Sequence, residues 1–340
     1  MPPAAYRTHE LAFRTQYAEL KERARSMPAL LPGTPGTLVQ RAGSGRVYWY
    51  RVYQSAAGKQ VEDLVCKADD DATLADTRAQ IEFAQWTAAQ VRNLRKLDFQ
   101  VADKGVAGVL VEMHNQTLLS AGICIVGTLC YMAWLNELGA RAVTARTQDI
   151  DLAVQPRLKL AAPLSFLQTM QATKMGFVPV PGLPHQTPST SVKLTGQDGL
   201  RVDVLTHGAA LGTSMPLPQL MWHAQTVPFY DYLLHQPREA AILAGGHCVP
   251  VLLPQPERFI WHKLYSSASR KSFPEKAAKD LQQAVTLAAV LVEQEDESLA
   301  PAYNEAPAAL KAAIRRRRST ILHAASRHPD TQAALESCLA

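Results

Sequence analysis

The sequence is poor in cysteine, and its five cysteines show none of the spacings typical of disulfide frameworks or metal sites: Cys66, Cys124, Cys130, Cys248 and Cys338. An odd number of scattered thiols without a CxxC pair is typical of the reducing cytosol. The N-terminus lacks the basic start and apolar segment of a signal peptide. No stretch is apolar for long enough to cross a bilayer. We therefore expect a cytoplasmic protein with no membrane partner.

Several chemical motifs are also missing. The ten histidines have no HExxH or HxH spacing, which argues against zinc. No GxSxG and no GxxxxGK[ST] occurs, which argues against an α/β-hydrolase and a P-loop protein. Only 19% of the residues are charged, and the net charge is +5 with a pI near 8.9. This mildly basic balance permits an anionic partner such as a nucleotide or RNA without requiring one.

The chain does contain enough apolar material for a large core. With 340 residues, 47% of them hydrophobic, it has room for two domains or for one core with two appendages. We expect an α/β (α+β) protein in three parts. Residues 1–97 predict a helix, a small antiparallel β module and a linking helix. Residues 98–255 predict a core around a small mixed β-sheet, and residues 256–340 predict a helical segment.

Periodicity and turn residues place the elements within these parts. In the first part we expect a helix over 6–26, strands at 36–41, 47–53 and 61–67, and a helix over 70–97. The core is predicted to hold helices at 107–119 and 129–138 and strands at 123–126, 148–154, 200–206 and 247–253. Helices are expected over 256–267, 274–292 and 306–325. The aromatic residues 48–50 and 53 either pack against neighbouring elements or form a base-stacking platform.

An Asp-x-Asp pattern gives the strongest chemical signal. In a strand, Asp149 and Asp151 point to the same side while Ile150 points to the other, and their Cα atoms lie about 6.6 Å apart. At an effective dielectric constant near 20, two carboxylates at this distance repel by about 2–3 kcal/mol. Magnesium, which prefers oxygen ligands, would relieve that repulsion. The same pattern alone is also typical of the solvent-facing side of an edge strand.

Two further features favour the metal interpretation. Gly127 and Thr128 lie between a buried strand and a helix, where backbone amides at a helix N-terminus can bind phosphate. Asp203 stands between two valines on a later strand and is placed to be a third carboxylate. Three acids around two metal ions are typical of phosphoryl transfer, with Asp203 as ligand and general base.

This order of elements resembles the polymerase-β nucleotidyltransferase superfamily, which has a Gly-Ser or Gly-Gly turn before a helix, an Asp-x-Asp on the next strand and a later Asp. It is most similar to bacterial domains of the GSU2487-type nucleotidyltransferase family, over about residues 120–206. Thr128 replaces the serine of the turn and keeps the hydroxyl. The interval from Gly127 to Asp149 is longer than in many superfamily members. Arg141 and Arg146, in that insertion, either reach a triphosphate or lie in a solvated loop.

The C-terminal part carries a second resemblance. Residues 256–264, followed by Arg270 and then Lys279 and Asp280, are similar to the helical segment of abortive-infection nucleotidyltransferase toxins. The resemblance implies that Lys263 and Arg270 bind nucleotide phosphate; a snorkelling surface lysine is the alternative for Lys263. Asp280 lies at the edge of an apolar helix stripe, so we expect it to pair with Lys263 or Arg270.

Together these resemblances imply a nucleotidyltransferase that binds two Mg²⁺ ions (Mn²⁺ as a substitute) and moves an NMP from an NTP such as ATP to an acceptor hydroxyl, releasing pyrophosphate. The implied acceptor is RNA or tRNA, which the basic run 315–318 slightly favours. Nucleotidylation of a protein or a small molecule, or a catalytically inactive binding protein with this fold, remain open alternatives. The expected metal ligands and catalytic residues are Asp149, Asp151 and Asp203, and the expected nucleotide-binding residues are Gly127, Thr128, Lys263 and Arg270.

Overall fold

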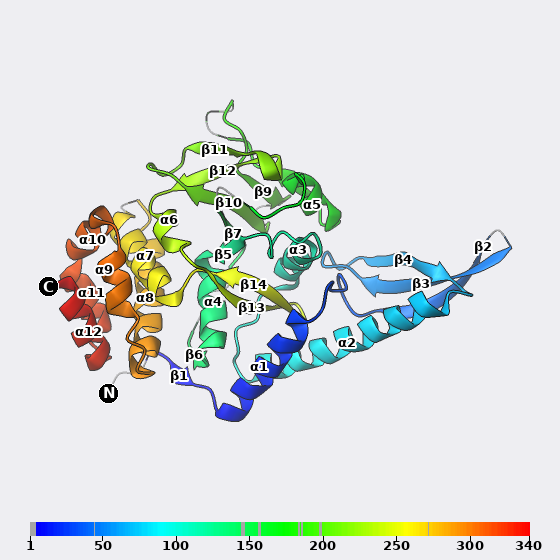
Figure 1. Ribbon diagram of the computed structural model, residues 1–340, viewed down its shortest axis with the longest axis horizontal. Helices are drawn as coiled ribbons and strands as arrows, with labels where there is room; N and C mark the ends of the chain where they lie inside the picture. Colours follow the sequence, from blue (N-terminus) through cyan, green and yellow to red (C-terminus); the bar gives the residue numbers. More distant parts are fainter. Residues whose placement is uncertain are drawn as a thin grey trace.

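The protein has a central sheet, a projecting β module at one end and a group of helices at the other (Figure 1). The computed structural model describes residues 5–43, 45–143, 147–155, 158–182, 184, 186–196, 199–270 and 272–340. This arrangement confirms the expected mixed α/β class, with an N-terminal β module and a helical C-terminal part. The proposed boundaries at residues 97 and 255 stay predictions.

Within the described residues the central sheet has nine strands, more than the small sheet we expected. Its path runs β11-β12-β10-β7-β5-β14-β13, with β9 beside β10 and β8 beside β9. The strands are β5 (Ile123–Val126), β7 (Asp149–Val154), β8 (Phe177–Pro179), β9 (Ser191–Leu194), β10 (Arg201–His207), β11 (Ser214–Leu217), β12 (Trp222–Val227), β13 (Arg238–Ala244) and β14 (His247–Leu253).

The middle of this sheet mixes both strand directions. β10 runs parallel to β7 and to β12, whereas β5 is antiparallel to β7. All four residues of β5 are buried, which agrees with its uninterrupted apolar sequence and with packing on both faces. The predicted strands at 123–126, 148–154, 200–206 and 247–253 are confirmed to within one residue at each end.

Helices cover the sheet. These are α3 (Lys104–Asn115), α4 (Gly127–Glu137), α5 (Phe166–Ala172) and α6 (Tyr230–Leu233), with a 3₁₀ turn η1 (Pro218–Leu220). α4 follows β5 directly and packs on β7 and β13. Beyond α4, a two-residue strand β6 (Ala140–Arg141) pairs with β1 (Arg7–Thr8) near the N-terminus. α4 therefore begins at the end of β5 and runs across the core.

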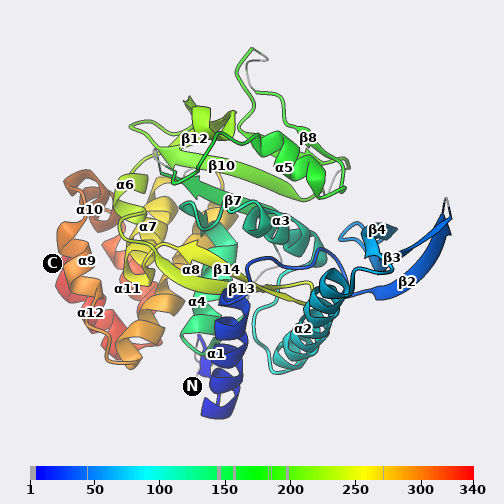
Figure 2. The same cartoon turned by 45° about the vertical axis from the view of Figure 1, so that its right-hand side comes forward.

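The β2–β4 module is an antiparallel sheet of β2 (Thr37–Gly43), β3 (Arg46–Gln54) and β4 (Gln60–Lys67), which projects from the body of the protein (Figures 1 and 2). The long helix α2 (Asp71–Lys96) runs back from it to the core (Figure 1). Asp70 caps this helix by accepting a hydrogen bond from the Thr73 amide. α1 (Leu11–Arg25) and α2 pack against the β13–β14 hairpin and form a second apolar cluster there.

The C-terminal helices are α7 (Pro256–Ser269), α8 (Pro274–Glu293), α9 (Leu299–Glu305), α10 (Ala308–Arg315), α11 (Arg318–Ala325) and α12 (Pro329–Leu339). The single helix predicted over 306–325 is wrong, because the chain breaks at Arg316 and Arg317 between α10 and α11. The break lets α11 pack beside α12 and α8. It also divides the basic run 315–318 between two helices.

None of the described helices is long and apolar enough to span a membrane. The five cysteines all lie in described segments as free thiols.

Candidate active site

The strand register brings the three predicted carboxylates to one face of the sheet. In the parallel pair β7–β10, Asp151 lies opposite Asp203, and Asp149 lies opposite Arg201. The intervening residues, Ile150 on β7 and Val202 on β10, are fully buried on the other face. Asp149, Asp151 and Asp203, here called the acidic cluster, therefore share the face that α7 and α8 approach.

The carboxylate of Asp151 lies directly against Gly127. Val126, the last residue of β5, lies opposite Asp151, so the next residue along the chain meets its side chain. Gly127 has φ +68°, and a Cβ placed there would lie 1.9 Å from Asp151 Oδ2. Only glycine fits this conformation and this contact. The following Thr128 is buried in the first turn of α4, and no side chain caps that helix. The N-terminal amides of α4 are thus available to an anion.

The acidic cluster is electrostatically strained. The pKa of Asp151 is raised from 3.8 to about 6, first by burial and then by the negative charges of Asp203 and Asp149. Lys263 and Arg270 act in the opposite sense. Asp149, Asp203, Lys263 and Arg270 therefore all lie close enough to Asp151 to influence its charge. The excess of negative charge leaves a place for a cation.

Two of the predicted cations are held by a buried acid. Lys263 Nζ on α7 lies 2.6 Å from Asp280 Oδ1 on α8, and Arg270 Nε lies 3.2 Å from Asp280 Oδ2. Asp280 and Lys263 are buried, whereas Arg270 is partly exposed. The predicted pairing of Asp280 with Lys263 and Arg270 is confirmed. Asp280 therefore holds both cations at the junction of α7 and α8, close enough to Asp151 for their charges to lower its pKa.

Sequence reasoning missed two residues at this site. Arg201 donates from Nε to Asp203 Oδ1 at 2.7 Å and from its terminal nitrogen to Ser191 Oγ at 2.8 Å. Its position two residues before Asp203 on one strand could have indicated this contact. Lys279 precedes Asp280, and burial lowers its pKa, as does the charge of Lys263. Lys279 has no ion pair or hydrogen bond to any described residue.

Other predicted cations lie elsewhere or outside the description. Arg141 forms an ion pair with Asp98 beyond the C-terminal end of α4, and it does not join the acidic cluster. Arg146 lies outside the described residues. In the basic run, Arg315 stacks on Tyr303 at 5.9 Å and Arg318 bonds Glu336 at 2.6 Å, so two of its four cations are engaged within the helical part.

The donor set suits a hard divalent cation, although its atoms are not at ligand spacing. Across the described residues, no group of three His, Cys, Asp or Glu side chains is close enough to hold a metal ion. The acidic cluster nevertheless supplies only oxygen donors, which Mg²⁺ prefers. After burial, the negative charges of Asp203 and Asp149 contribute to the raised pKa of Asp151, and a bound cation would oppose them.

A sequence profile of a family described as Nucleotidyltransferase matches residues 104–308. The chain belongs to this family. The match begins at the first residue of α3 and takes in the acidic cluster, the first turn of α4 and the cations of α7 and α8. It leaves outside the whole N-terminal part, with α1, the β2–β4 module and α2, and at the other end α11, α12 and all of α10 except its first residue. This nucleotidyltransferase family usually uses divalent metal ions, and its membership implies a nucleoside triphosphate substrate.

Two solved structures show distant similarity to this nucleotidyltransferase. One is an antigenic nucleotidyltransferase-like protein from Paracoccidioides brasiliensis, with 19% identity, a TM-score of 0.37, and coverage of 68% of this chain and 91% of that one. The other is the antibiotic-resistance factor ANT(2'')-Ia, with 17% identity, a TM-score of 0.33, and coverage of 66% and 96%. TM-scores below 0.5 are too low to transfer structural detail. No curated protein matches the chain.

Proposed function

We propose that this nucleotidyltransferase transfers an NMP from an NTP to an acceptor hydroxyl with release of pyrophosphate, and that the acidic cluster is its catalytic and metal-binding centre. The observation that carries the proposal is the β7–β10 register, which sets Asp203 beside Asp151 on the face where α4 begins. The similarity to the polymerase-β superfamily and to the toxin helices points in the same direction.

The proposed role of each residue follows from its charge and its position in the site. Asp149, Asp151 and Asp203 would hold the Mg²⁺ ions, which when bound neutralise phosphate charge and activate the attacking hydroxyl. The amides after Gly127 and the Thr128 hydroxyl bind phosphate oxygens at the start of α4.

Lys263, Arg270 and Lys279 offset the negative charge of the polyphosphate from the opposite side. Lys279 has no partner within the described chain, so it is the cation most available to a substrate.

The reaction itself is an in-line displacement at the α-phosphorus. The acceptor oxygen forms a bond to that phosphorus, the bond to the oxygen bridging to the β-phosphate breaks, and pyrophosphate leaves with the bonding electrons. Asp203 takes the proton of the acceptor hydroxyl. Arg201 occupies Asp203 Oδ1, which fixes the orientation of the carboxylate and leaves Oδ2 for this task.

An RNA acceptor is supported by the open face of the β2–β4 module. Trp49 faces α2, where Arg78 stacks on its ring at 5.8 Å, so Tyr48 on the same strand points to the opposite face. Tyr48 lies between Arg41 on β2 and Lys67 on β4.

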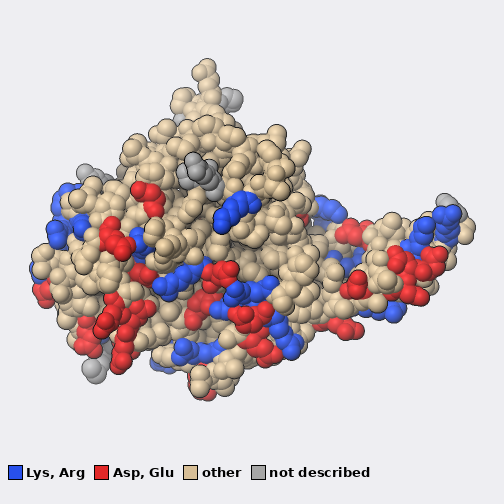
Figure 3. Space-filling view, viewed as in Figure 1, with Lys and Arg blue, Asp and Glu red and all other residues tan. Residues whose placement is uncertain are grey.

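Tyr50 follows on that open face, opposite the exposed Leu64. Aromatic side chains beside cations on a sheet are typical of surfaces that stack single-stranded bases, at about 1–3 kcal/mol per base. Lys67 flanks Tyr48 in this way, while Arg41 on its other side pairs with Glu62 at 2.9 Å. On the side of the protein in Figure 3, positive and negative side chains are interspersed over both the body and the projecting module.

The decisive experiment incubates the protein and Mg²⁺ with each α-³²P-labelled NTP and with total RNA, soluble protein or small-molecule extract. Label in a ribonuclease-sensitive product identifies an RNA acceptor, and label in a protease-sensitive product identifies a protein acceptor. Asp149→Ala should abolish transfer, while Asp76→Ala, an exposed acid on α2, should not change it. Transfer that persists in Asp149→Ala would contradict the assignment of the acidic cluster.

The RNA acceptor is tested separately. Tyr48→Ala should reduce label transfer to RNA by about tenfold because one stacking contact is lost, and it should leave slow transfer to water or to a small hydroxyl compound unchanged. Equal transfer to RNA by the variant and the native protein would exclude the open face of the module as the RNA-binding surface.

A further inference from the structure

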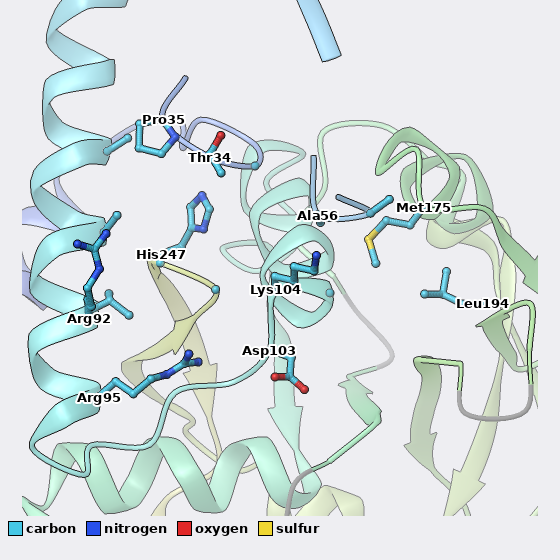
Figure 4. A pocket seen from close by; sticks show the side chains of 18 residues that line it. Thr34, Pro35, Ala56, Arg92, Arg95, Asp103, Lys104, Met175, Leu194 and His247 are labelled. Carbon is cyan, nitrogen blue, oxygen red and sulfur yellow. The ribbon is translucent and has the colours of Figure 1, made fainter. Parts of the chain in front are cut away.

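A cavity of about 880 Å³ lies where the β2–β4 module meets the core, away from the acidic cluster (Figure 4). Its walls come from α2, the first turn of α3, the β13–β14 turn and the loops at 33–35 and 56–57. β14 pairs with β5 at Leu252, whereas the cavity is lined by His247 at the other end of that strand. Small-molecule sites have volumes of about 300–1,000 Å³, so this cavity is of the right size for one.

One end of the cavity is cationic. Arg92 and Arg95 lie one turn apart on α2 (Figure 4). Lys104 opens α3 across the cavity, and its ammonium group points toward Ala56 (Figure 4). Arg92 and Lys104 have no ion pair or hydrogen bond within the described ranges, and Arg95 makes only 3.5 Å contacts to two backbone carbonyls. Asp103 contributes one negative charge to the same end. Three cations and the positive N-terminal end of α3 therefore outweigh one acid.

The other end is apolar and closely fitted. Ala56, Met175 and Leu194 line it (Figure 4). A Cβ at Gly108 on α3 would lie 2.6 Å from the Ala56 Cβ and 3.0 Å from the Met175 sulfur, so glycine lets both side chains approach the helix. On the opposite wall, the α2 residue Ala88 has a small side chain that takes up little of the cavity. The cavity thus joins a charged end to an apolar end.

The walls of the cavity are preformed. A Cβ at Gly245, which has φ +54°, would lie 2.7 Å from the Cα of Lys104. The β13–β14 turn therefore packs directly against the first turn of α3. His247 Nε2 donates to the Leu31 carbonyl at 3.0 Å and ties the turn to the loop that carries Thr34. Burial lowers the pKa of His247. Preformed walls reduce the entropic cost of binding.

We propose that this cavity is a second binding site, for a nucleoside polyphosphate. Its phosphates lie against Arg92 and Arg95, its base and ribose lie against Met175 and Leu194, and Lys104 lies between the two ends. The several negative charges of a polyphosphate would neutralise the cationic end of the cavity. The base and ribose of a nucleoside are only weakly polar and would fill the rest of its volume. The site is independent of the proposed transfer reaction and shares no residue with the acidic cluster.

Isothermal titration in EDTA tests the proposal, with ATP and inorganic pyrophosphate as separate probes. Without divalent ions, the acidic cluster repels both probes. We expect both to bind, and Arg92→Gln/Arg95→Gln to weaken both by at least about tenfold. Lys96→Gln removes an exposed charge from the same helix outside the cavity and should change neither. Leu194→Ala should weaken ATP but not pyrophosphate, because only ATP reaches the apolar end.

Two outcomes would overturn the proposal. The first is absence of binding of either probe at millimolar concentration. The second is binding that Lys279→Gln abolishes and Arg92→Gln/Arg95→Gln leaves unchanged, which would place the ligand beside the acidic cluster instead. Circular dichroism checks that the double variant is folded, and Lys104→Gln replaces it if it is not. Retention of label transfer in the variants separates this site from the transfer centre.

Discussion

Replacement of Asp151 by asparagine should make the protein more stable at neutral pH while removing its activity. The pKa of this carboxyl rises from 3.8 to about 6 on folding, first because of burial and then because of Asp203 and Asp149. Above pH 6 the group is ionised in both the folded and the unfolded chain, and the folded state bears a cost of about 3 kcal/mol. Below pH 4 it is protonated in both, and the cost disappears. The native protein therefore loses this much stability as the pH rises from about 4 to about 6, and Asp151→Asn does not.

Urea unfolding followed by tryptophan fluorescence measures this difference. At pH 8 the free energy of unfolding of Asp151→Asn should exceed that of the native protein by up to about 3 kcal/mol, and the gap should close near pH 4. Asp149→Asn, at an exposed position, should shift stability by less than about 0.5 kcal/mol. Added Mg²⁺ should stabilise the native protein and not Asp151→Asn. A gap that is absent at pH 8, or that does not change with pH, would refute the electrostatic argument.

Three further predictions concern the surroundings of the acidic cluster. Gly127→Ala should destabilise the protein by about 1–3 kcal/mol in urea unfolding and abolish transfer. The control Gly43→Ala should be nearly neutral, because an added Cβ there meets nothing within 4 Å. Equal effects of the two substitutions would argue against the contact of Gly127 with Asp151. Lys263→Met should lower the free energy of unfolding by up to about 3–5 kcal/mol because it leaves the buried Asp280 with only the more exposed Arg270 as a partner. Lys263→Met/Asp280→Leu should recover most of that loss, and failure to recover would mean that packing dominates. Lys279→Gln should raise KM for the NTP about tenfold without changing the melting temperature; a lowered melting temperature would indicate a structural role instead.

Local patterns predicted most of the elements that carry the site. The alternation in 149–151 placed both acids on one side of a strand, and the turn at Gly127 separated a buried strand from a helix, as the structure shows. The pairing of Asp203 with Asp151 depends on the register between strands some 50 residues apart, which no local pattern determines. Arg201 was missed although its contact with Asp203 is local, since the two residues are only two positions apart on the same strand.

The sequence also failed to predict elements where local composition favours one conformation and packing imposes another. β13 has the sequence REAAILA, in which three alanines favour a helix, and it forms a strand because the tight Gly245 turn pairs it with β14. In the C-terminal part the sequence favoured one helix over 306–325, and packing on α8 and α12 divides it into two. Tertiary contacts decided both cases.

The contact at Gly127 also offers a way to sort related sequences. Because the carboxylate of Asp151 occupies the space of the absent methyl group, any larger residue at this position must displace that carboxylate. A homologue that retains all three acids but carries alanine or serine in place of this glycine is therefore expected to bind metal poorly. Inspection of this one position would separate active from lapsed enzymes more reliably than a count of aspartates.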